Sequence, residues 1–146
     1  MYEAGILEDN RYELINGQII PKVPKCSLHT VTHSCLLFKL SALYEKFQAL
    51  LCISLHIDEF NLPDADFCVL WKVFSLATSE KYIRPHEVAV VGEVATDTLE
   101  FDLTTKVQLY ARANVPMYAV LDAVGRRFLL HTEPSADGYG RIVEFA

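Results

Sequence analysis

The stretch Glu87-Val-Ala-Val-Val-Gly-Glu-Val-Ala95 is rich in β-branched residues and carries one acid, Glu93, in its interior. A run this apolar is typical of a central strand that is buried on both faces of a sheet. Gly92 within it indicates a bulge or a close approach of the backbone. An isolated charge at Glu93 would cost several kcal/mol, so this carboxylate needs a cation or a hydrogen-bond donor beside it.

The segments on either side of this strand predict a mixed sheet with helices packed on it. Asn16-Gly17 between two short alternating runs is a strong hairpin signal, because both turn residues need positive φ. A first helix is expected from two adjacent lines of apolar residues, and so wide a stripe predicts packing on more than one side. A second helix is expected after the central strand, and Asn114 and Pro116 end it.

These elements predict an α/β fold of the mixed α+β kind, in which a central mixed β-sheet is flanked by helices and preceded by an N-terminal β-hairpin. The expected elements are the hairpin Arg11–Ile15 with Gln18–Ile20, a helix over Ser27–Phe47 with Ser27 as its N-cap, strands Leu51–Ile57, Asp66–Leu70 and Glu87–Ala95, a helix over Asp102–Ala113, strand Met117–Leu121, and a closing hairpin of Arg127–His131 with Arg141–Phe145 across the loop Pro134–Gly140.

Length and composition restrict the class of protein. The 146 residues, of which 51% are hydrophobic and 22% charged, suit one globular domain over residues 1–146. The net charge is 13 − 19 = −6 without any basic block, so no wide electrostatic footprint for nucleic acid is visible, whereas an acidic chain suits a divalent-metal site. No signal peptide or membrane span is recognisable. The four cysteines form no C-x-x-C pair and have apolar or small neighbours, which predicts buried free thiols in the cytoplasm.

Two carboxylates are candidates for chemistry. Asp66 opens a short strand, and with Glu93 it could share a Mg²⁺ ion, which prefers oxygen ligands and needs only one or two protein carboxylates. Alternatively, Glu93 caps an amide or pairs with an arginine, and composition alone favours this structural role. His29 and His33 lie one helical turn apart, but no zinc motif follows them. By spacing alone, Lys106 forms a helix salt bridge with Asp102.

Several motifs, in this order and spacing, resemble the Uma-two family of restriction-endonuclease-like proteins in the PD-(D/E)XK nuclease superfamily. Individually they are weak, but together they cover nearly the whole chain. They are Ala4-Gly-Ile-Leu7, Tyr12-Glu-Leu-Ile-Asn-Gly-Gln-Ile19, His29, Leu62-Pro-Asp-Ala-Asp-Phe-Cys-Val-Leu70, the stretch from Gly92-Glu-Val-Ala95 through Asp97, Leu99 and Asp102 to Lys106, then Leu109-Tyr-Ala-Arg-Ala113, Val115-Pro116 and Tyr118-Ala-Val-Leu-Asp122.

The resemblance implies a restriction-endonuclease-like core and metal-dependent hydrolysis of DNA phosphodiester bonds. Carried over residue by residue, Asp66 and Glu93 would bind Mg²⁺ (or Mn²⁺), and Lys106 would orient or activate water. Glu13 would add a further carboxylate, and His29 would lie at the rim of the site. The resemblance also implies DNA as the partner. Nucleases that cut two strands need two sites, so a homodimer is expected.

The sequence departs from the family pattern in three places. Ala95 stands where the superfamily has its lysine, two residues after the glutamate, so Lys106 must reach back from the helix. Ala65 replaces the proline before the strand aspartate, so Asp64 competes with Asp66 as the metal ligand. The family's N-terminal helix and C-terminal segment are largely missing.

These departures keep two other functions open. The chain could be a non-catalytic module that retains the nuclease fold for interaction or oligomerisation. It could also be an unrelated small α/β ligand-binding protein, in which an arginine would neutralise Glu93.

Overall fold

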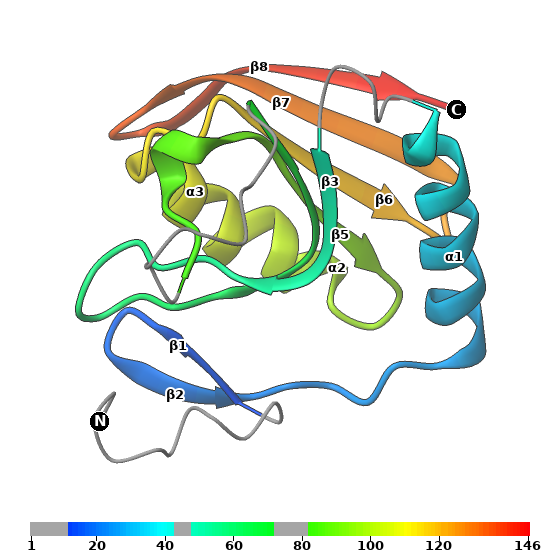
Figure 1. The fold of residues 1–146 in the computed structure, drawn as a ribbon, viewed down its shortest axis with the longest axis horizontal. Coiled ribbons are helices and arrows are strands. Elements are labelled where there is room, and N and C mark those ends of the chain that lie inside the picture. Colours follow the sequence, from blue (N-terminus) through cyan, green and yellow to red (C-terminus); the bar gives the residue numbers. More distant parts are fainter. Residues whose placement is uncertain (1–11, 43–47, 72–81) are drawn as a thin grey trace.

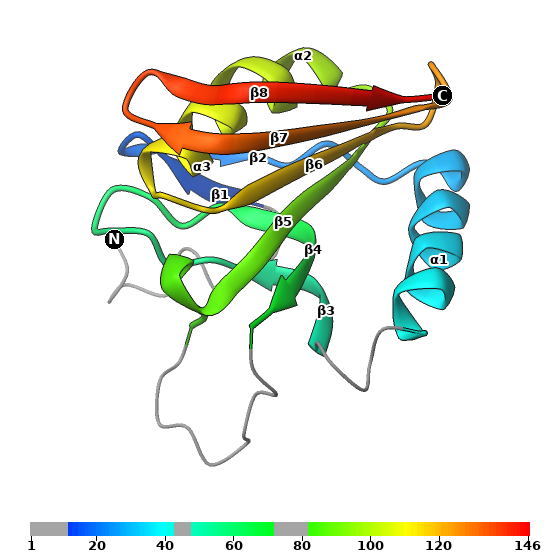
Figure 2. The same cartoon turned by 90° about the horizontal axis from the view of Figure 1, so that it is seen from above.

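A six-stranded mixed sheet forms the centre of the protein (Figures 1 and 2). The computed structural model describes residues 12–42, 48–71 and 82–146. The strands lie side by side in chain order, with β5 and β6 parallel and the other neighbouring pairs antiparallel. They are β3 (Gln48–Ser54), β4 (Asp64–Leu70), β5 (Val88–Ala95), β6 (Met117–Asp122), β7 (Arg127–Ser135) and β8 (Gly138–Phe145). The predicted mixed α+β architecture, with its central valine-rich strand, is therefore confirmed.

The predicted N-terminal hairpin is present as a separate two-stranded sheet, β1 (Tyr12–Ile15) with β2 (Gln18–Pro21). Its turn has φ of 51° at Asn16 and 74° at Gly17, as this type of hairpin turn requires. Two backbone hydrogen bonds between Leu14 and Leu62 attach the hairpin to the segment before β4. The start predicted at Arg11 lies outside the described residues.

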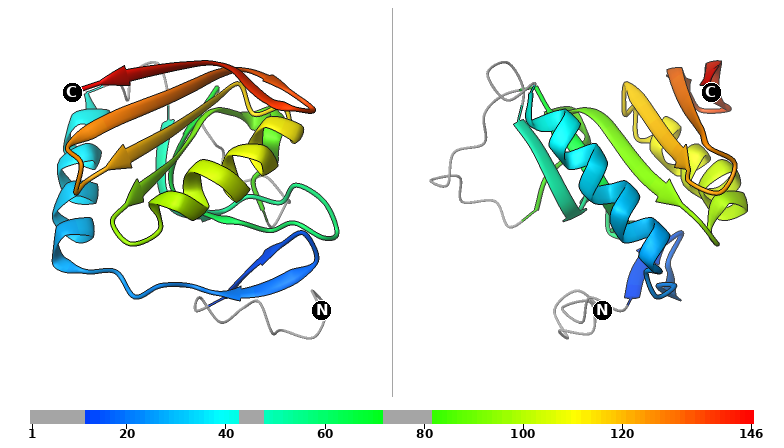
Figure 3. Two further views of the ribbon diagram at one scale, coloured as in Figure 1. Left: turned by 180° about the vertical axis from the view of Figure 1, so that it is seen from behind. Right: turned by 90° about the vertical axis from the view of Figure 1, so that its right-hand side faces the viewer.

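A helical segment makes the crossover between the parallel strands β5 and β6, and Figure 3 shows it lying across the sheet. It runs as α2 (Leu99–Phe101), the π-helical segment η3 (Asp102–Lys106) and α3 (Val107–Arg112). It thus begins three residues before the predicted Asp102, and its middle has the wider π form. Single π turns in helices are frequent at functional sites.

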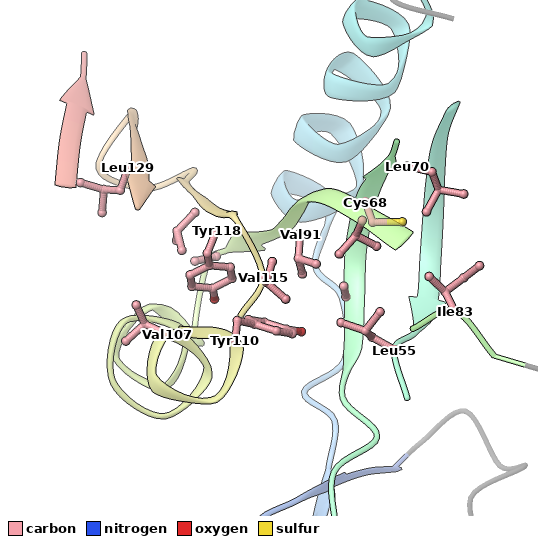
Figure 4. Close-up of a cluster of buried hydrophobic side chains, with 14 residues drawn as sticks. Leu55, Cys68, Leu70, Ile83, Val91, Val107, Tyr110, Val115, Tyr118 and Leu129 are labelled. Atoms are coloured by element: carbon pink, nitrogen blue, oxygen red, sulfur yellow. The ribbon is translucent and has the colours of Figure 1, made fainter. Parts of the chain in front are cut away.

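The hydrophobic core lies between this helical segment and the sheet and continues towards β3 and β4 (Figure 4). Tyr110 and Tyr118 are fully buried, and their ring centroids are 4.9 Å apart. Gly92 in β5 is required by a close contact, as predicted: the ring of Phe67, its cross-strand partner in β4, occupies the place of a Cβ atom.

The first helix, α1 (Ser27–Ser41), differs from the prediction that it packs on more than one side. It contacts β3 and β5, but among its residues only His29 is buried, while Val31 is 60% and Phe38 81% exposed. An apolar stripe in the sequence indicates which side chains a helix could bury. It does not indicate whether a neighbouring element covers those side chains. Cys26 takes the N-cap position instead of Ser27 and makes no side-chain capping bond. Residues 43–47 of the predicted helix lie outside the described part.

Strand boundaries also differ from the predicted ones. β3 begins three residues earlier than Leu51 and ends at Ser54, before the predicted Ile57. The closing strands β7 and β8 extend through the predicted loop, where Pro134 pairs with Tyr139. Proline and glycine weigh against a strand, but this part of β7 lies beyond its last pairing with β6, in a two-stranded extension.

The cysteines do not match the prediction of buried thiols. All four are free, but Cys26, Cys35 and Cys52 are exposed and only Cys68 is buried. Apolar neighbours in the sequence do not bury Cys26 and Cys35, which lie just before and on an exposed helix, or Cys52, which the register of β3 with β4 skips. Within the described residues, no helix is both long and apolar enough to cross a membrane.

Substitution of Gly92 by alanine should destabilise the fold, because the new methyl group would overlap the ring of Phe67. We expect a loss of about 1–3 kcal/mol in the free energy of unfolding, as is usual for overpacking, measured by urea denaturation. In a Phe67→Leu background the same change should cost clearly less. An equal cost in both backgrounds would show that the ring does not constrain Gly92.

Candidate active site

The five residues predicted for the site line one cleft with a volume of about 880 Å³. They come from segments far apart in the chain: Glu13 from β1, His29 from α1, Asp66 from β4, Glu93 from β5 and Lys106 from η3. The fold therefore brings together side chains that are up to 93 positions apart in the sequence (106 − 13 = 93).

Strand pairing places Asp66 and Glu93 side by side. The antiparallel register of β4 and β5 pairs Phe67 with Gly92, so one step further along each strand brings Asp66 opposite Glu93. Opposite residues of such a pair point to the same face of the sheet. The backbone ladder stops here, and Asp66 Oδ2 instead accepts a hydrogen bond of 2.8 Å from the backbone N–H of Val94.

The backbone of β3 is irregular on the other side of Asp66. The register pairs Leu51 with Phe67 and Ile53 with Ala65, and it skips Cys52, which has a positive φ of 48°. Left-handed backbone at a non-glycine residue costs energy and is concentrated at functional sites. Asp66 thus lies where both neighbouring ladders are interrupted, which leaves its carboxylate free to turn into the cleft.

Glu93 is buried beside a lysine and a tyrosine. Its Oε1 accepts hydrogen bonds from Lys106 Nζ at 3.0 Å and from the Tyr110 hydroxyl at 3.2 Å. These contacts do not occupy Oε2. Because the cation beside Glu93 is a lysine, the ligand-binding alternative, in which an arginine neutralises this acid, does not match the structure.

Glu13 is buried as well. The Leu14–Leu62 bridge brings β1 against the start of β4, where Glu13 Oε2 accepts a hydrogen bond of 3.1 Å from the Asp64 N–H. The same oxygen lies 3.2 Å from Lys106 Nζ. Two carboxylates, from different sheets, therefore hold one ammonium group.

Asp102 does not form the helix salt bridge that its spacing from Lys106 predicts. The salt bridges of Lys106 run to Glu13 and Glu93, while Asp102 Oδ2 accepts a hydrogen bond of 2.7 Å from Thr98 Oγ1. The reason is the π-helical geometry of residues 102–106, since a wider turn no longer stacks positions i and i+4.

Negative charge exceeds positive charge in the interior of the cleft. Burial raises the pKa of Glu93 well above its ordinary value; Lys106 counteracts this only in part, and Asp102, Asp66 and Glu13 raise the pKa further. Burial lowers the pKa of Lys106, but the nearby carboxylates outweigh this effect and raise it above its ordinary value. The proton on Lys106 is thus strongly held. The one positive charge of Lys106 does not balance the negative charge of the carboxylates around it.

Asp66 has three further partners, from α1 and the connection before it. His29 Nε2 lies 3.0 Å from Oδ2, Lys25 Nζ lies 2.8 Å from Oδ1, and His33 Nε2 lies 2.7 Å from the backbone oxygen. Burial raises the pKa of Asp66, but the hydrogen bonds from Lys25 and the Val94 N–H lower it below its ordinary value overall.

Lys25, His33 and Tyr110 were not identified as site residues from the sequence. Tyr110 follows Lys106 by four positions and His33 follows His29 by four, so helical spacing could have indicated both. The sequence gives no comparable signal for Lys25, which lies in the connection between β2 and α1.

Asp64, the alternative ligand, also lines the cleft, because residues two apart on a strand share a face. Its carboxylate binds the Ser54 hydroxyl and the Lys22 ammonium group. Its backbone oxygen accepts a hydrogen bond of 3.0 Å from Lys106 Nζ.

The side chains present fit Mg²⁺ or Mn²⁺. The candidate ligands are carboxylate oxygens, the donors that these hard cations prefer, and the cleft has an excess of negative charge. Among the described residues, no three His, Cys, Asp or Glu side chains form a metal-binding group. This does not conflict with Mg²⁺, which keeps several waters and needs only one or two protein carboxylates.

The charge balance around Lys106 predicts opposite effects of two neutralising substitutions. Lys106→Met leaves Glu13 and Glu93 buried without a cation and should reduce the free energy of unfolding by about 3–5 kcal/mol. Glu93→Gln relieves a crowded acid while Glu13 still holds Lys106, so the change should stay within about 1 kcal/mol or be stabilising.

Urea denaturation of both variants is the measurement. Lys39→Met, at an exposed position of α1, is the matched control and should change stability by no more than about 0.5 kcal/mol. A larger loss for Glu93→Gln than for Lys106→Met would contradict this account of the charges.

Comparisons with known proteins agree with the fold. One solved structure similar to this chain is described as "a putative nuclease belonging to DUF820 from Anabaena variabilis"; the TM-score is 0.73 at 14% identity, over 92% of this chain and 75% of that chain. At so low an identity the likeness shows the fold alone. No curated protein matches the chain. The family model Uma2, described as "Putative restriction endonuclease", matches residues 2–145. The match spans nearly the whole sequence, and this protein therefore belongs to the Uma2 family.

Proposed function

We propose that this protein is a Mg²⁺- or Mn²⁺-dependent endonuclease that hydrolyses phosphodiester bonds of DNA. The observation that carries the proposal is the position of Asp66 opposite Glu93 in the cleft, which the register of β4 and β5 gives, with the ammonium group of Lys106 beside Glu93. Membership of a nuclease-related family supports the reaction class. The free thiols suit the reducing environment of the cytoplasm.

Asp66 and Glu93 would hold the metal ion. Asp66 is favoured over Asp64, because it lies opposite Glu93, whereas the Asp64 carboxylate is bound by Ser54 and Lys22. When bound, Mg²⁺ supplies a Lewis acid for the phosphate and lowers the pKa of a coordinated water.

The chain's own groups would position the reactants. Lys106 acts as a fixed positive charge near the attacking water and the phosphate, because Glu93 and Glu13 hold its Nζ in place. Tyr110 donates to Glu93 and fixes the orientation of that carboxylate. His29 does the same for Asp66 at Oδ2. Groups that are held in advance stabilise developing charge without rearranging during the reaction.

Cleavage of plasmid DNA tests the proposal. The purified protein should nick or cut DNA in Mg²⁺ or Mn²⁺, and a chelator should abolish the activity. Glu93→Gln keeps the side-chain volume but removes a ligand charge, so it should reduce the rate at least about 100-fold and weaken metal binding in calorimetry.

Glu144→Gln is the matched control, because Glu144 is an exposed acid of β8 that pairs with Arg127 at the surface. It should cut DNA at the wild-type rate. If the wild type binds no metal and Glu93→Gln unfolds the protein, the acids are structural, and a non-catalytic interaction module is the better account.

We also propose that the protein acts as a homodimer, since two sites related by a two-fold axis can cut both strands. The described surface offers an apolar region on α1, where Leu28, Val31, Leu37 and Phe38 are exposed. Such a region on one helix suits a self-complementary contact.

Phe38→Asp should therefore shift the protein from dimer to monomer, because a charge would be buried in the contact. The measurement is the mass by light scattering at protein concentrations of tens of micromolar. Lys39→Ala, at the next position, should leave the dimer intact. A monomeric wild type at these concentrations would contradict the dimer, and an unchanged dimer in Phe38→Asp would exclude this surface.

A further inference from the structure

The connection between β2 and α1 carries two lysines into the candidate active site. Figure 1 shows this segment running from the hairpin to the start of α1. We call residues 22–25 (Lys-Val-Pro-Lys) the basic strap, and all four residues line the cleft. Lys22 binds the carboxylate of Asp64, and Lys25 binds that of Asp66. Each acid in dispute as the metal ligand is therefore paired with one lysine of the strap.

The two oxygens of Asp66 are held in different ways. Oδ2 lies in the interior, where it accepts from the Val94 N–H at 2.8 Å and contacts His29 Nε2 at 3.0 Å. Oδ1 receives Lys25 Nζ at 2.8 Å. If Lys25 withdraws, the two contacts on Oδ2 still fix the orientation of the carboxylate, and only Oδ1 is released.

Of the two ammonium groups beside Asp66 and Glu93, that of Lys25 is the more exposed. Its side chain is 47% exposed, whereas that of Lys106 is 6% exposed and is held by two carboxylates. Half-exposed ion pairs of lysine contribute little stability, so little free energy is needed to break the contact of Lys25 with Asp66. Lys106, in contrast, cannot leave without stranding Glu13 and Glu93.

A divalent cation and an ammonium group cannot both bind Oδ1 closely, because they repel each other strongly at contact distance. Building on the proposed metal site, we infer that Lys25 is an exchangeable counter-ion of Asp66. It holds the carboxylate in the metal-free protein, competes with the metal ion for Oδ1, and is released towards the DNA phosphates when the ion binds. Lys25 is thus a positioning residue that sets the metal affinity of the site.

The test is calorimetric titration of the folded protein with Mn²⁺ in the absence of DNA. Lys25→Met keeps the length of the side chain but removes the competing charge. It should therefore tighten Mn²⁺ binding by about two- to fivefold, the effect of a half-exposed ion pair. Lys25→Gln is a second variant in case the first is poorly folded, and it should shift the affinity in the same direction.

Lys22→Met is the matched control, since it removes the same charge from the same strap but from Asp64. Tighter binding in the Lys25 variants with unchanged binding in Lys22→Met supports the exchange. Equal tightening in both would overturn it, because a general charge effect would then suffice. Unchanged or weaker binding in the Lys25 variants would overturn it too, as expected for a purely structural lysine.

The outcome also separates this inference from the proposed nuclease function. If the wild type binds Mn²⁺ and cuts DNA while the Lys25 variants bind no tighter, only the exchange fails. If neither the wild type nor the Lys25 variants bind Mn²⁺, the metal-dependent function fails, and the exchange fails with it. If the Lys25 variants bind Mn²⁺ and the wild type does not, the exchange is supported, because Lys25 then blocks the metal site.

Discussion

The buried ammonium group of Lys106 is the interaction on which the arrangement of this protein depends. It lies within 3.2 Å of an oxygen from each of Glu13, Asp64 and Glu93, and so joins the hairpin, β4, β5 and the crossover helix at one point. The hairpin is a separate two-stranded sheet. Among the described residues, its contacts with the larger sheet include the Leu14–Leu62 bridge and this cluster. A lysine so far from water persists because the carboxylates balance its charge, and without it they would repel each other.

The position of this lysine on a helix follows from the packing of the strand. Ala95 lies two residues after Glu93, on the same face of β5, and its side chain is fully buried in the hydrophobic core together with Val107 and Tyr110. A lysine at position 95 would place its charge in that core. The π-helical turn at residues 102–106 instead directs Lys106 from the crossover helix to Glu93. The same ammonium–carboxylate contact is thus made by a residue 13 positions from the acid.

Much of the fold and the candidate site could be predicted because the signals are local. Valine-rich β5 and the Asn16-Gly17 turn specify their own structure, and the short motifs that resemble the Uma2 family indicated five of the residues that line the cleft. The exposure of Phe38 and the contacts of Lys25 with Asp66 could not be predicted, because they depend on how α1 and its connection dock against the sheet. The π-helical turn was equally hidden, since the apolar spacing of residues 102–113 fits an ordinary helix.

In the proposed function, an acidic chain must bind DNA, and the cleft offers a way to do so. The net charge is −6, and four acids, Glu13, Asp66, Glu93 and Asp102, are buried in or beside the site. The charge of Lys106 is used by its carboxylates, so it does little to attract phosphate from a distance. In the proposed function, a metal ion would offset most of this negative charge and free Lys25 at the same moment. Metal binding would then strengthen DNA binding through two cations, the metal ion itself and the released ammonium group of Lys25.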